Sequence, residues 1–205
     1  MTLTKIEEIG LRVQKDLDKM PVVATPPVEA TQTAHKTAAI ASLGGLKAYN
    51  EFTLDRYDNK AAIAKCEGFP KVNLYIWGKS GTGKTHLATA LVRDSQWYTI
   101  VKPSHIFRQL RGKDGDQEQE VINKYAKMGI LVIDDLGAEK STEFNISMLY
   151  EIIDQRDMNY VKGLIITSNL SLGMLSEKLG DDRICSRLAG MCRVVELGGE
   201  DRRIA

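Results

Sequence analysis

The chain has 205 residues, of which 43% are hydrophobic, and its 28 Lys and Arg balance 27 Asp and Glu. This apolar content excludes disorder throughout the chain, and 17 Gly with only 5 Pro exclude a collagen-like protein. A net charge of +1 provides no general basic field, so any nucleic-acid contact must come from a local patch. No apolar run reaches the roughly 18 residues of a membrane helix, and charged residues stand where a secretion signal would be apolar. We therefore expect a cytoplasmic protein without membrane contact.

Residues 1–20 place apolar side chains at helical spacing, with charged side chains between them, which predicts an amphipathic helix. Pro21 ends this helix, and a proline-containing linker is expected over residues 21–45. A single short helix cannot bury its own apolar stripe. We expect it to dock on a partner, and the alternative is that it folds back onto the globular body.

Residues 46–205 alternate short apolar runs with helical patterns, which predicts one α/β domain with a parallel sheet between layers of helices. We predict strands over residues 72–77, 97–101, 130–134, 164–167 and 193–197. We predict helices over residues 84–92, 104–111, 117–127, 142–159, 172–179 and 183–189. Three cysteines without a C-x-x-C pair are expected to be reduced thiols in the core of this domain: Cys66, Cys185 and Cys192.

A phosphate-loop pattern, GxxxxGK[ST], lies between the first predicted strand and the first predicted helix of this domain. Its glycines let backbone N–H groups face a polyphosphate, and the start of the following helix adds a favourable partial charge. We expect Lys84 to reach the β- and γ-phosphates of a nucleotide and the Thr85 hydroxyl to bind Mg²⁺. The predicted nucleotide-binding residues are Gly78, Lys79, Ser80, Gly81, Thr82, Gly83, Lys84, Thr85 and His86.

Two carboxylates follow the apolar strand at residues 130–134. We expect Asp134 to hold the Mg²⁺ shell and Asp135 to polarise the water that attacks the γ-phosphate. Two alternatives stay open, because Asp135 can instead cap the turn after the strand and Glu139 stands nearby as a competing base.

Polar residues also end the strand at residues 164–167. If this strand lies beside the phosphate-loop strand, Asn169 or Thr167 can hydrogen-bond the γ-phosphate or the attacking water; the alternative is that Ser or Asn caps the next helix. Further along, Arg183 and Arg187 lie four residues apart on one predicted helix and share a face. An arginine there can serve a phosphoryl group in trans, and the alternative is a solvated surface arginine.

With these motifs the chain resembles the AAA+ ATPases of the DnaC/DnaI helicase-loader family over roughly residues 46–203. The matching segments are GxxGTGKTHLA (78–88), LVIDDLGAEKxTE (131–143), LYEII (149–153), IITSNLSL (165–172) and RICSRLAGMCRVVELGGED (183–201). The resemblance implies an AAA+ fold with the helical lid absent or vestigial. It also implies Mg²⁺-dependent ATP hydrolysis, with Walker A and Walker B motifs at residues 78–85 and 131–135.

The same resemblance implies roles for single residues. Asn169 takes the sensor-1 position, and Arg187 takes the place of the arginine finger that completes a neighbour's ATP site. Arg203 matches an arginine that ends the family's C-terminal motif and is expected to contact nucleotide, although Arg202 stands where the family has an aromatic residue. Members load a DnaB-type replicative helicase onto single-stranded DNA. They place an N-terminal segment on the helicase and assemble with ATP, and the expected self-association is a ring, spiral or filament.

A basic run after the second predicted strand is the candidate DNA contact. In related loaders this region faces the ring pore, so the resemblance implies that Arg108, Arg111 and Lys113 grip DNA phosphates. The alternative is a solvated face that pairs with the acidic residues after it. Phe107 is expected to belong to the core rather than to stack on bases.

Two other functions remain as alternatives. An IstB-like transposition helper shares the ATPase core, but that family usually has Asp-Glu where this chain has Asp134-Asp135. An ATP-dependent scaffold that does not hydrolyse ATP is the third possibility, because Asp135 replaces that glutamate.

Overall fold

The computed structural model describes residues 51–140 and 142–202. The predicted helix at residues 1–20, the linker at 21–45 and Arg203 lie outside the described residues. The helices are α4 (Lys60–Lys65), α5 (Lys84–Val92), α6 (Pro103–Leu110), α7 (Gly115–Ala126), α8 (Glu143–Met158), α9 (Leu172–Leu179) and α10 (Arg183–Met191). The strands are β1 (Asn73–Trp77), β2 (Tyr98–Val101), β3 (Ile130–Leu136), β4 (Leu164–Ser168) and β5 (Cys192–Glu196).

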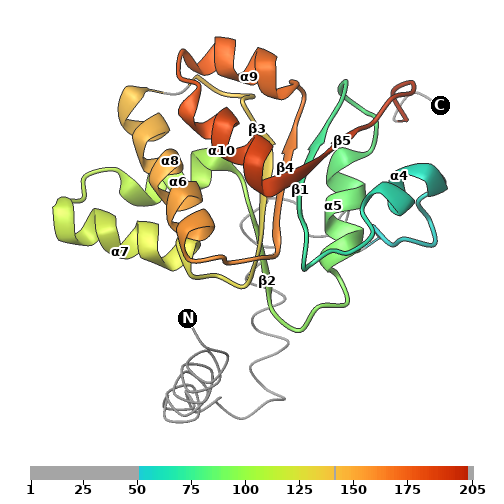
Figure 1. Cartoon of the computed structure of the whole chain (residues 1–205), viewed down its shortest axis with the longest axis horizontal. Helices are drawn as coiled ribbons and strands as arrows, with labels where there is room; N and C mark the ends of the chain where they lie inside the picture. The colour runs from blue at the N-terminus through green and yellow to red at the C-terminus, as the bar shows by residue number, and fades with distance from the viewer. Residues whose placement is uncertain (1–50, 141, 203–205) are drawn as a thin grey trace, which may run out of the picture. The chain divides into compact units, whose positions relative to one another are not determined.

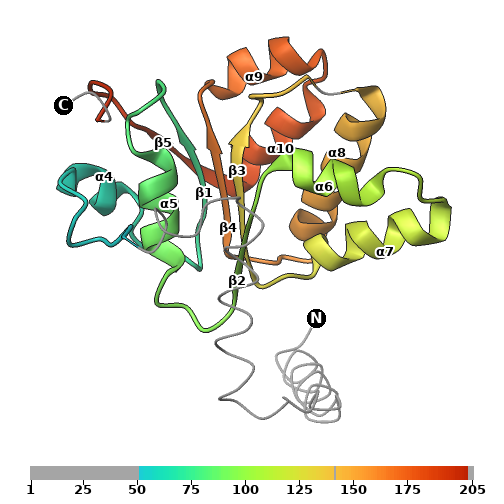
Figure 2. The same cartoon turned by 180° about the vertical axis from the view of Figure 1, so that it is seen from behind.

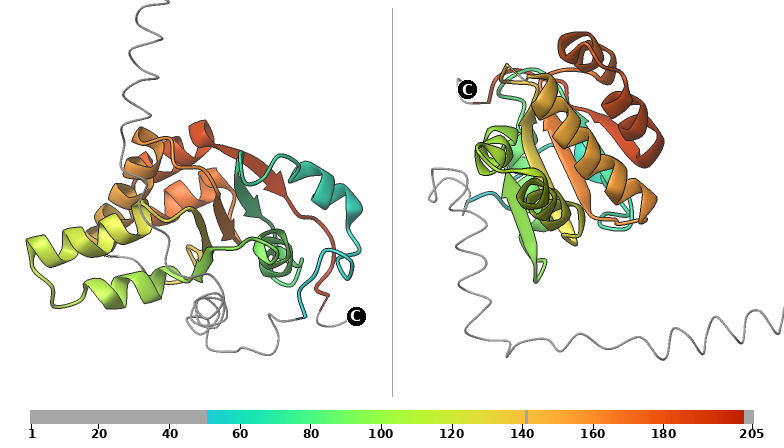
Figure 3. Two further views of the ribbon diagram at one scale, coloured as in Figure 1. Left: turned by 90° about the horizontal axis from the view of Figure 1, so that it is seen from below. Right: turned by 90° about the vertical axis from the view of Figure 1, so that its left-hand side faces the viewer.

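The strands form a five-stranded parallel sheet in the order β2-β3-β4-β1-β5. The central strands β1 and β4 are buried along almost their whole length, as expected for a parallel sheet covered on both faces. Helices α4 and α5 lie on one side of the strands, and α6, α7, α8 and α10 lie on the other (Figures 1 and 2). The view from below in Figure 3 shows the same separation. The predicted parallel α/β architecture is therefore confirmed.

Two cores fill the spaces on either side of the sheet. Alternation along β3 divides its side chains between them, since Leu131 and Ile133 join the core under α6, α7 and α8, and Val132 joins the core under α5. Cys66, Cys185 and Cys192 are buried free thiols, as predicted. Phe107 packs against the first core, which confirms its expected place.

Local sequence signals set the starts of two of the predicted helices. Thr142 caps α8 by accepting the Asn145 N–H at 3.2 Å, and Ser171 caps α9 by accepting the Met174 N–H at 3.3 Å. Both ends of α5 and α9 fall as predicted, and the other predicted elements end within two residues of their expected positions. The prediction was wrong in two respects. Helix α4 was not expected, and β3 continues to Leu136 through an irregularity instead of ending at Asp134.

One buried arginine ties α8 to the end of α7 and to the loops that lead into β3 and β4. Arg156 on α8 is fully buried, and both terminal nitrogens of its guanidinium donate to backbone carbonyls. These carbonyls belong to Tyr125, Ala126, Met128, Gly129 and Lys162. The arginine therefore satisfies the carbonyl end of α7 and the loop that leads into β3. Burial lowers the pKa of Arg156 to about 10, which leaves it charged at neutral pH.

We expect Arg156→Met to lower the free energy of unfolding by about 3–5 kcal/mol, because it leaves several buried carbonyls without a donor. Urea denaturation measures this change. Arg111→Met, at an exposed helix end, is the matched control and should stay within about 0.5 kcal/mol of the wild type. Equal losses in the two variants would contradict the structural role of Arg156.

Candidate nucleotide-binding site

The predicted phosphate loop lies at the carboxyl end of β1 and leads directly into α5. This is the edge of a parallel α/β sheet at which ligands bind. Gly81 has φ of +78°, and a Cβ there would lie 1.9 Å from Oδ1 of Asp201. The left-handed backbone angle favours glycine at this position, and a side chain there would also require the Asp201 carboxylate to move.

The lysine of the loop is buried beneath it. Lys84 is 7% exposed, and its Nζ donates to the carbonyl oxygens of Gly78 at 2.8 Å and Lys79 at 2.7 Å. The Thr82 hydroxyl donates to the same Lys79 carbonyl at 2.9 Å. The ammonium group is thus held at the centre of the loop by the backbone itself.

A hydrogen-bonded carboxylate connects this loop with the middle of the sheet. Oδ1 of Asp134 accepts from the Thr85 hydroxyl at 2.8 Å and from the Thr167 hydroxyl at 2.7 Å. Burial raises the pKa of Asp134 above its ordinary value, and the hydrogen bonds from the two threonines act against this rise. The nearby charge of Asp135 raises the pKa further, whereas that of Lys102 lowers it.

Asp135 adopts an unusual backbone conformation, with φ of +65°. The register of β3 against β4 shifts between Ile133 and Leu136, and the Asp135 N–H donates to Oγ1 of Thr167 at 2.8 Å. The side chain of Asp135 is also hydrogen-bonded, because Nδ2 of Asn169 donates to its Oδ1 at 3.1 Å. The helix caps here are Thr142 and Ser171, so helix capping accounts for neither Asp135 nor Asn169. The Asp135 carbonyl closes the turn after β3 by accepting the Ala138 N–H at 3.3 Å.

The competing carboxylate, Glu139, is half-buried after β3. Burial raises its pKa, the hydrogen bond from Ser104 lowers it, and the charge of Asp135 raises it. Its Oε1 is buried and has no hydrogen-bond partner in the described part of the chain. Glu139 does not line the cavity described next, and Asp135 does.

A cavity of about 510 Å³ collects these groups, a size typical of small-molecule sites. It is lined by Phe52, Ser80, Gly81, Gly83, Lys84, Thr85, His86, Lys102, Asp134, Asp135, Thr167, Asn169 and Arg202. The structure therefore brings the phosphate loop together with the carboxylates of β3 and the polar end of β4, as the sequence predicted. Three predicted loop residues, Gly78, Lys79 and Thr82, shape the loop without lining the cavity.

Sequence reasoning missed three residues of this cavity. Lys102 follows β2 at the same edge of the sheet, a position that could have indicated it. Phe52 stacks on His86 with ring centroids 4.5 Å apart, and Arg202 reaches the cavity from the segment after β5. No local pattern pointed to Phe52, and the family resemblance pointed to Arg203 rather than to Arg202.

The two arginines of α10 lie elsewhere. Arg187 pairs with Asp154 of α8 at 2.5 Å and with Asp157 at 3.1 Å, and Arg183 lies 4.8 Å above the ring of Tyr150. Both line a second hollow, of about 340 Å³, so they share a face as predicted. Neither lines the cavity at the phosphate loop of the same chain.

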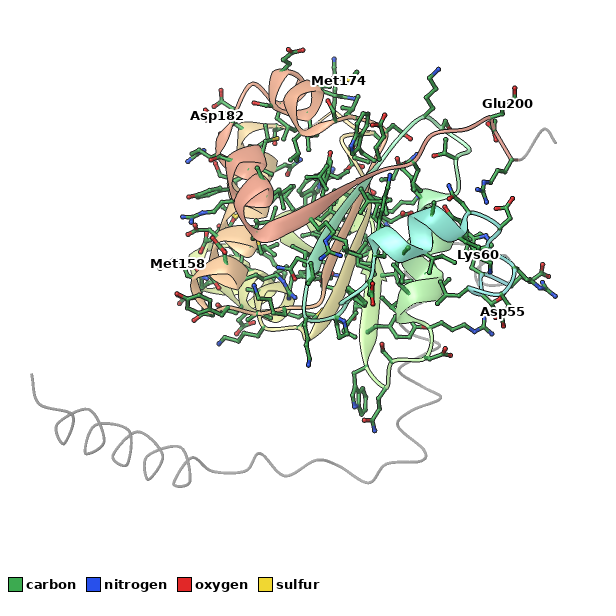
Figure 4. All side chains as sticks on the ribbon, turned by 45° about the vertical axis from the view of Figure 1, so that its right-hand side comes forward. Asp55, Lys60, Met158, Met174, Asp182 and Glu200 are labelled. Atoms are coloured by element: carbon green, nitrogen blue, oxygen red, sulfur yellow. The ribbon has the colours of Figure 1, made fainter. Side chains whose placement is uncertain are left out.

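In Figure 4, Asp182 at the start of α10 and Glu200 in the segment after β5 lie at opposite sides of the view.

The candidate DNA residues lie at the end of α6 and in the loop that follows. Arg108 and Arg111 are exposed, and Lys113 is half-buried. Within residues 51–140 and 142–202, no ion pair joins them to the acidic residues of α7. The described contacts do not show the pairing that the alternative expects, whereas the exposure of Arg108 and Arg111 agrees with its solvated face.

The site suits a hard divalent cation that also binds phosphate. Thr85 and Asp134 provide a hydroxyl and a carboxylate oxygen, and Mg²⁺ characteristically takes one or two such protein groups together with phosphates and water. In the described part of the chain, no cluster of three or more His, Cys, Asp or Glu could hold a metal. No described helix is long and apolar enough to span a bilayer.

The sheet order, the phosphate loop after β1 and the carboxylate pair on β3 define an AAA+ protein of the P-loop class. The chain belongs to the family of IstB-like ATP binding proteins, whose model matches residues 53–205.

Individual proteins of two kinds are similar to this chain. A protein described as ATP-binding in insertion sequence IS5376 of Geobacillus stearothermophilus is 30% identical over 65% of this chain and 56% of its own length. The replicative helicase loader DnaC of Escherichia coli strain K12 is 25% identical over 51% of this chain and 46% of its own length. The chain thus spans about half the length of the curated relatives it matches.

A solved structure of the DnaC helicase loader superimposes with a TM-score of 0.60 at 26% identity. It covers 74% of this chain and 99% of that one. The predicted resemblance to the DnaC-type AAA+ proteins is confirmed.

Proposed function

We propose that this chain is a Mg²⁺-dependent ATPase that loads a DnaB-type replicative helicase onto single-stranded DNA, with hydrolysis acting as the switch. The observation that carries the ATPase assignment is the cavity in which the phosphate loop, Asp134, Asp135 and Asn169 meet. The likeness to the DnaC structure over nearly all of that chain supports the loader assignment.

In this mechanism the loop N–H groups and Lys84 bind the phosphates of ATP. Thr85 and Asp134 would hold Mg²⁺, which supplies charge neutralisation to the phosphates. Asp135 orients and polarises the attacking water, and Asn169 holds the Asp135 carboxylate in place through their hydrogen bond. The bulge in β3 directs both neighbouring carboxylates into one cavity.

In this proposal, a second copy of the chain completes the ATP site. Among the described residues that line the cavity the one arginine is Arg202, from the segment after β5, and Arg187 lies on a different surface of its own chain. We propose that Arg187 enters the neighbour's site, so that ATP drives head-to-tail association into a ring, spiral or filament. Residues 1–20 dock on the helicase, and Arg108, Arg111 and Lys113 contact DNA phosphates.

A second candidate is a transposition helper that acts with a transposase on DNA. The family model and the insertion-sequence protein from Geobacillus support it. Asp135 in place of the usual glutamate favours the loader.

The two candidate bases can be separated with isosteric amides. We expect Asp135→Asn to lower kcat for ATP hydrolysis by about 10²- to 10⁴-fold, the usual contribution of a general base, while ATP affinity is retained. Glu139→Gln is the matched control and should change kcat by less than about threefold, because Glu139 does not line the cavity. Phosphate release under saturating ATP measures both. The reverse result would assign the base to Glu139, and a wild-type rate no higher than that of Lys84→Ala would leave only the non-hydrolysing scaffold.

Arg187 should act in trans. We expect Arg187→Ala to bind ATP normally and to lose about 10³-fold or more in hydrolysis rate, as other phosphoryl-transfer fingers do. Mixing this variant with the separately inactive Lys84→Ala chain should restore hydrolysis, because some interfaces then combine an intact ATP site with an intact arginine. Wild-type turnover by Arg187→Ala, or no recovery in the mixture, would refute the assignment.

The partner can be identified by retention from host lysate with ATP present. We expect the full chain to retain a DnaB-type helicase and a chain without residues 1–45 to lose it while still binding ATP. The physical reason is that the apolar stripe of residues 1–20 would then be missing from the interface. Retention of a transposase instead would favour the transposition helper, and retention of the helicase by both chains would remove the docking role of residues 1–20.

A further inference from the structure

The segment after β5 is attached at two points, one just before the phosphate loop and one within it. Just before the loop, the Leu197 N–H donates to the Trp77 carbonyl at 2.7 Å. In the middle of the loop, the Gly81 carbonyl accepts from the Arg202 N–H at 3.1 Å. Figure 1 shows this segment running from β5 to the side of the sheet that carries α4 and α5. Backbone hydrogen bonds thus hold Arg202 beside the loop independently of the contacts of its side chain.

The side chain of Arg202 lies over the loop at Gly83. A Cβ on Gly83 would lie 3.5 Å from both Cδ and Nε of Arg202 and 3.1 Å from a ring carbon of Tyr57. The guanidinium lies 4.8 Å above the ring of Tyr57, and it pairs with the carboxylate of Asp58. Arg202 is therefore a cation at the rim of the cavity, and it is supported from below by a fully buried aromatic ring.

The ion pair between Arg202 and Asp58 is weak. The side chain of Asp58 is 79% exposed, and ion pairs with such exposed groups contribute only about 0–1 kcal/mol. A guanidinium binds a phosphate through short, charge-assisted and often paired hydrogen bonds, which are stronger. An anionic ligand in the cavity can therefore displace Asp58.

The position of Arg202 indicates which part of a nucleotide it meets. Thr85, Asp134 and Asn169 mark the end of the cavity at which the terminal phosphate reacts. Phe52 and Arg202 also line the cavity but belong to segments outside this polar group. A phosphate chain that begins at Asp134 and follows the loop past Gly83 has its ribose end nearest to Arg202.

We propose that Arg202 is a phosphate-binding residue for the nucleotide of its own chain, which exchanges the Asp58 carboxylate for the phosphate nearest the ribose. The proposal rests on the proposed nucleotide-binding function of the cavity. The ligand class is any nucleotide with at least a diphosphate, because the contact lies away from the phosphate that hydrolysis removes. Arg202 thus differs from Arg187, which is proposed to serve the terminal phosphate of a neighbour.

Calorimetric titration with ATP, ADP and inorganic tripolyphosphate, each with Mg²⁺, tests this assignment. We expect Arg202→Gln to weaken the binding of all three ligands by about 10- to 100-fold, the loss expected when a charge-assisted hydrogen bond is removed. Asp58→Asn should strengthen the binding of all three ligands by up to about fivefold, because the carboxylate that competes with the phosphate for Arg202 is removed. Arg56→Gln is the matched control and should leave the binding of all three ligands unchanged. Arg56 also pairs with an exposed carboxylate, that of Glu51, but it does not line the cavity.

Three results would overturn the proposal. Unchanged tripolyphosphate binding in Arg202→Gln, with weaker ATP binding, would place the residue against the base. Unchanged binding of all three ligands would leave Arg202 only as an attachment of the loop. Weaker binding in Asp58→Asn would make Asp58 a support of the contact rather than a competitor. Lys84→Ala separates this proposal from the one on which it rests, because binding that survives Lys84→Ala would refute the nucleotide site itself.

Discussion

The geometry of the site depends on one buried carboxylate that three parts of the chain share. Asp134 extends from β3 and accepts hydroxyl hydrogen bonds from Thr167 on β4 and from Thr85 at the start of α5. An ionised carboxylate is unfavourable inside a protein unless it is hydrogen-bonded, and here each donor comes from a different element. Satisfying Asp134 therefore fixes the position of α5, and with it the phosphate loop, relative to the middle of the sheet.

The same arrangement explains why the irregular end of β3 is maintained. In a regular strand, consecutive side chains point to opposite faces, so Asp134 and Asp135 could not both serve one cavity. The left-handed backbone of Asp135 interrupts that alternation. Thr167 stabilises the irregularity, because its hydroxyl accepts the Asp135 N–H while donating to Asp134. A single threonine thus supports both carboxylates that line the cavity, the buried Asp134 and the half-buried Asp135.

The parts of this structure that could be predicted are those that a local pattern determines. The phosphate loop, α5 and the strand before them follow from adjacent residues, and so does the carboxylate pair after an apolar run. Helix α4 has six residues, too few to show a period. Phe52 and Arg202 enter the cavity from segments far apart in sequence, and Arg156 binds carbonyls that only the folded chain brings together. These contacts depend on how segments cross in space, which periodicity and spacing do not encode.

The burial of all three cysteines has a consequence for following the protein in solution. Burial raises the pKa of Cys66 and Cys185 to about 11 and that of Cys192 to about 12, so very little thiolate exists at neutral pH. Thiol reagents can modify these residues only when the surrounding structure opens. Cys66 lies in the core on the α5 side of the sheet, and Cys185 and Cys192 lie in the opposite core. The alkylation rates of the three thiols therefore report separately on how fast the structure opens on each side of the sheet, and no label has to be introduced.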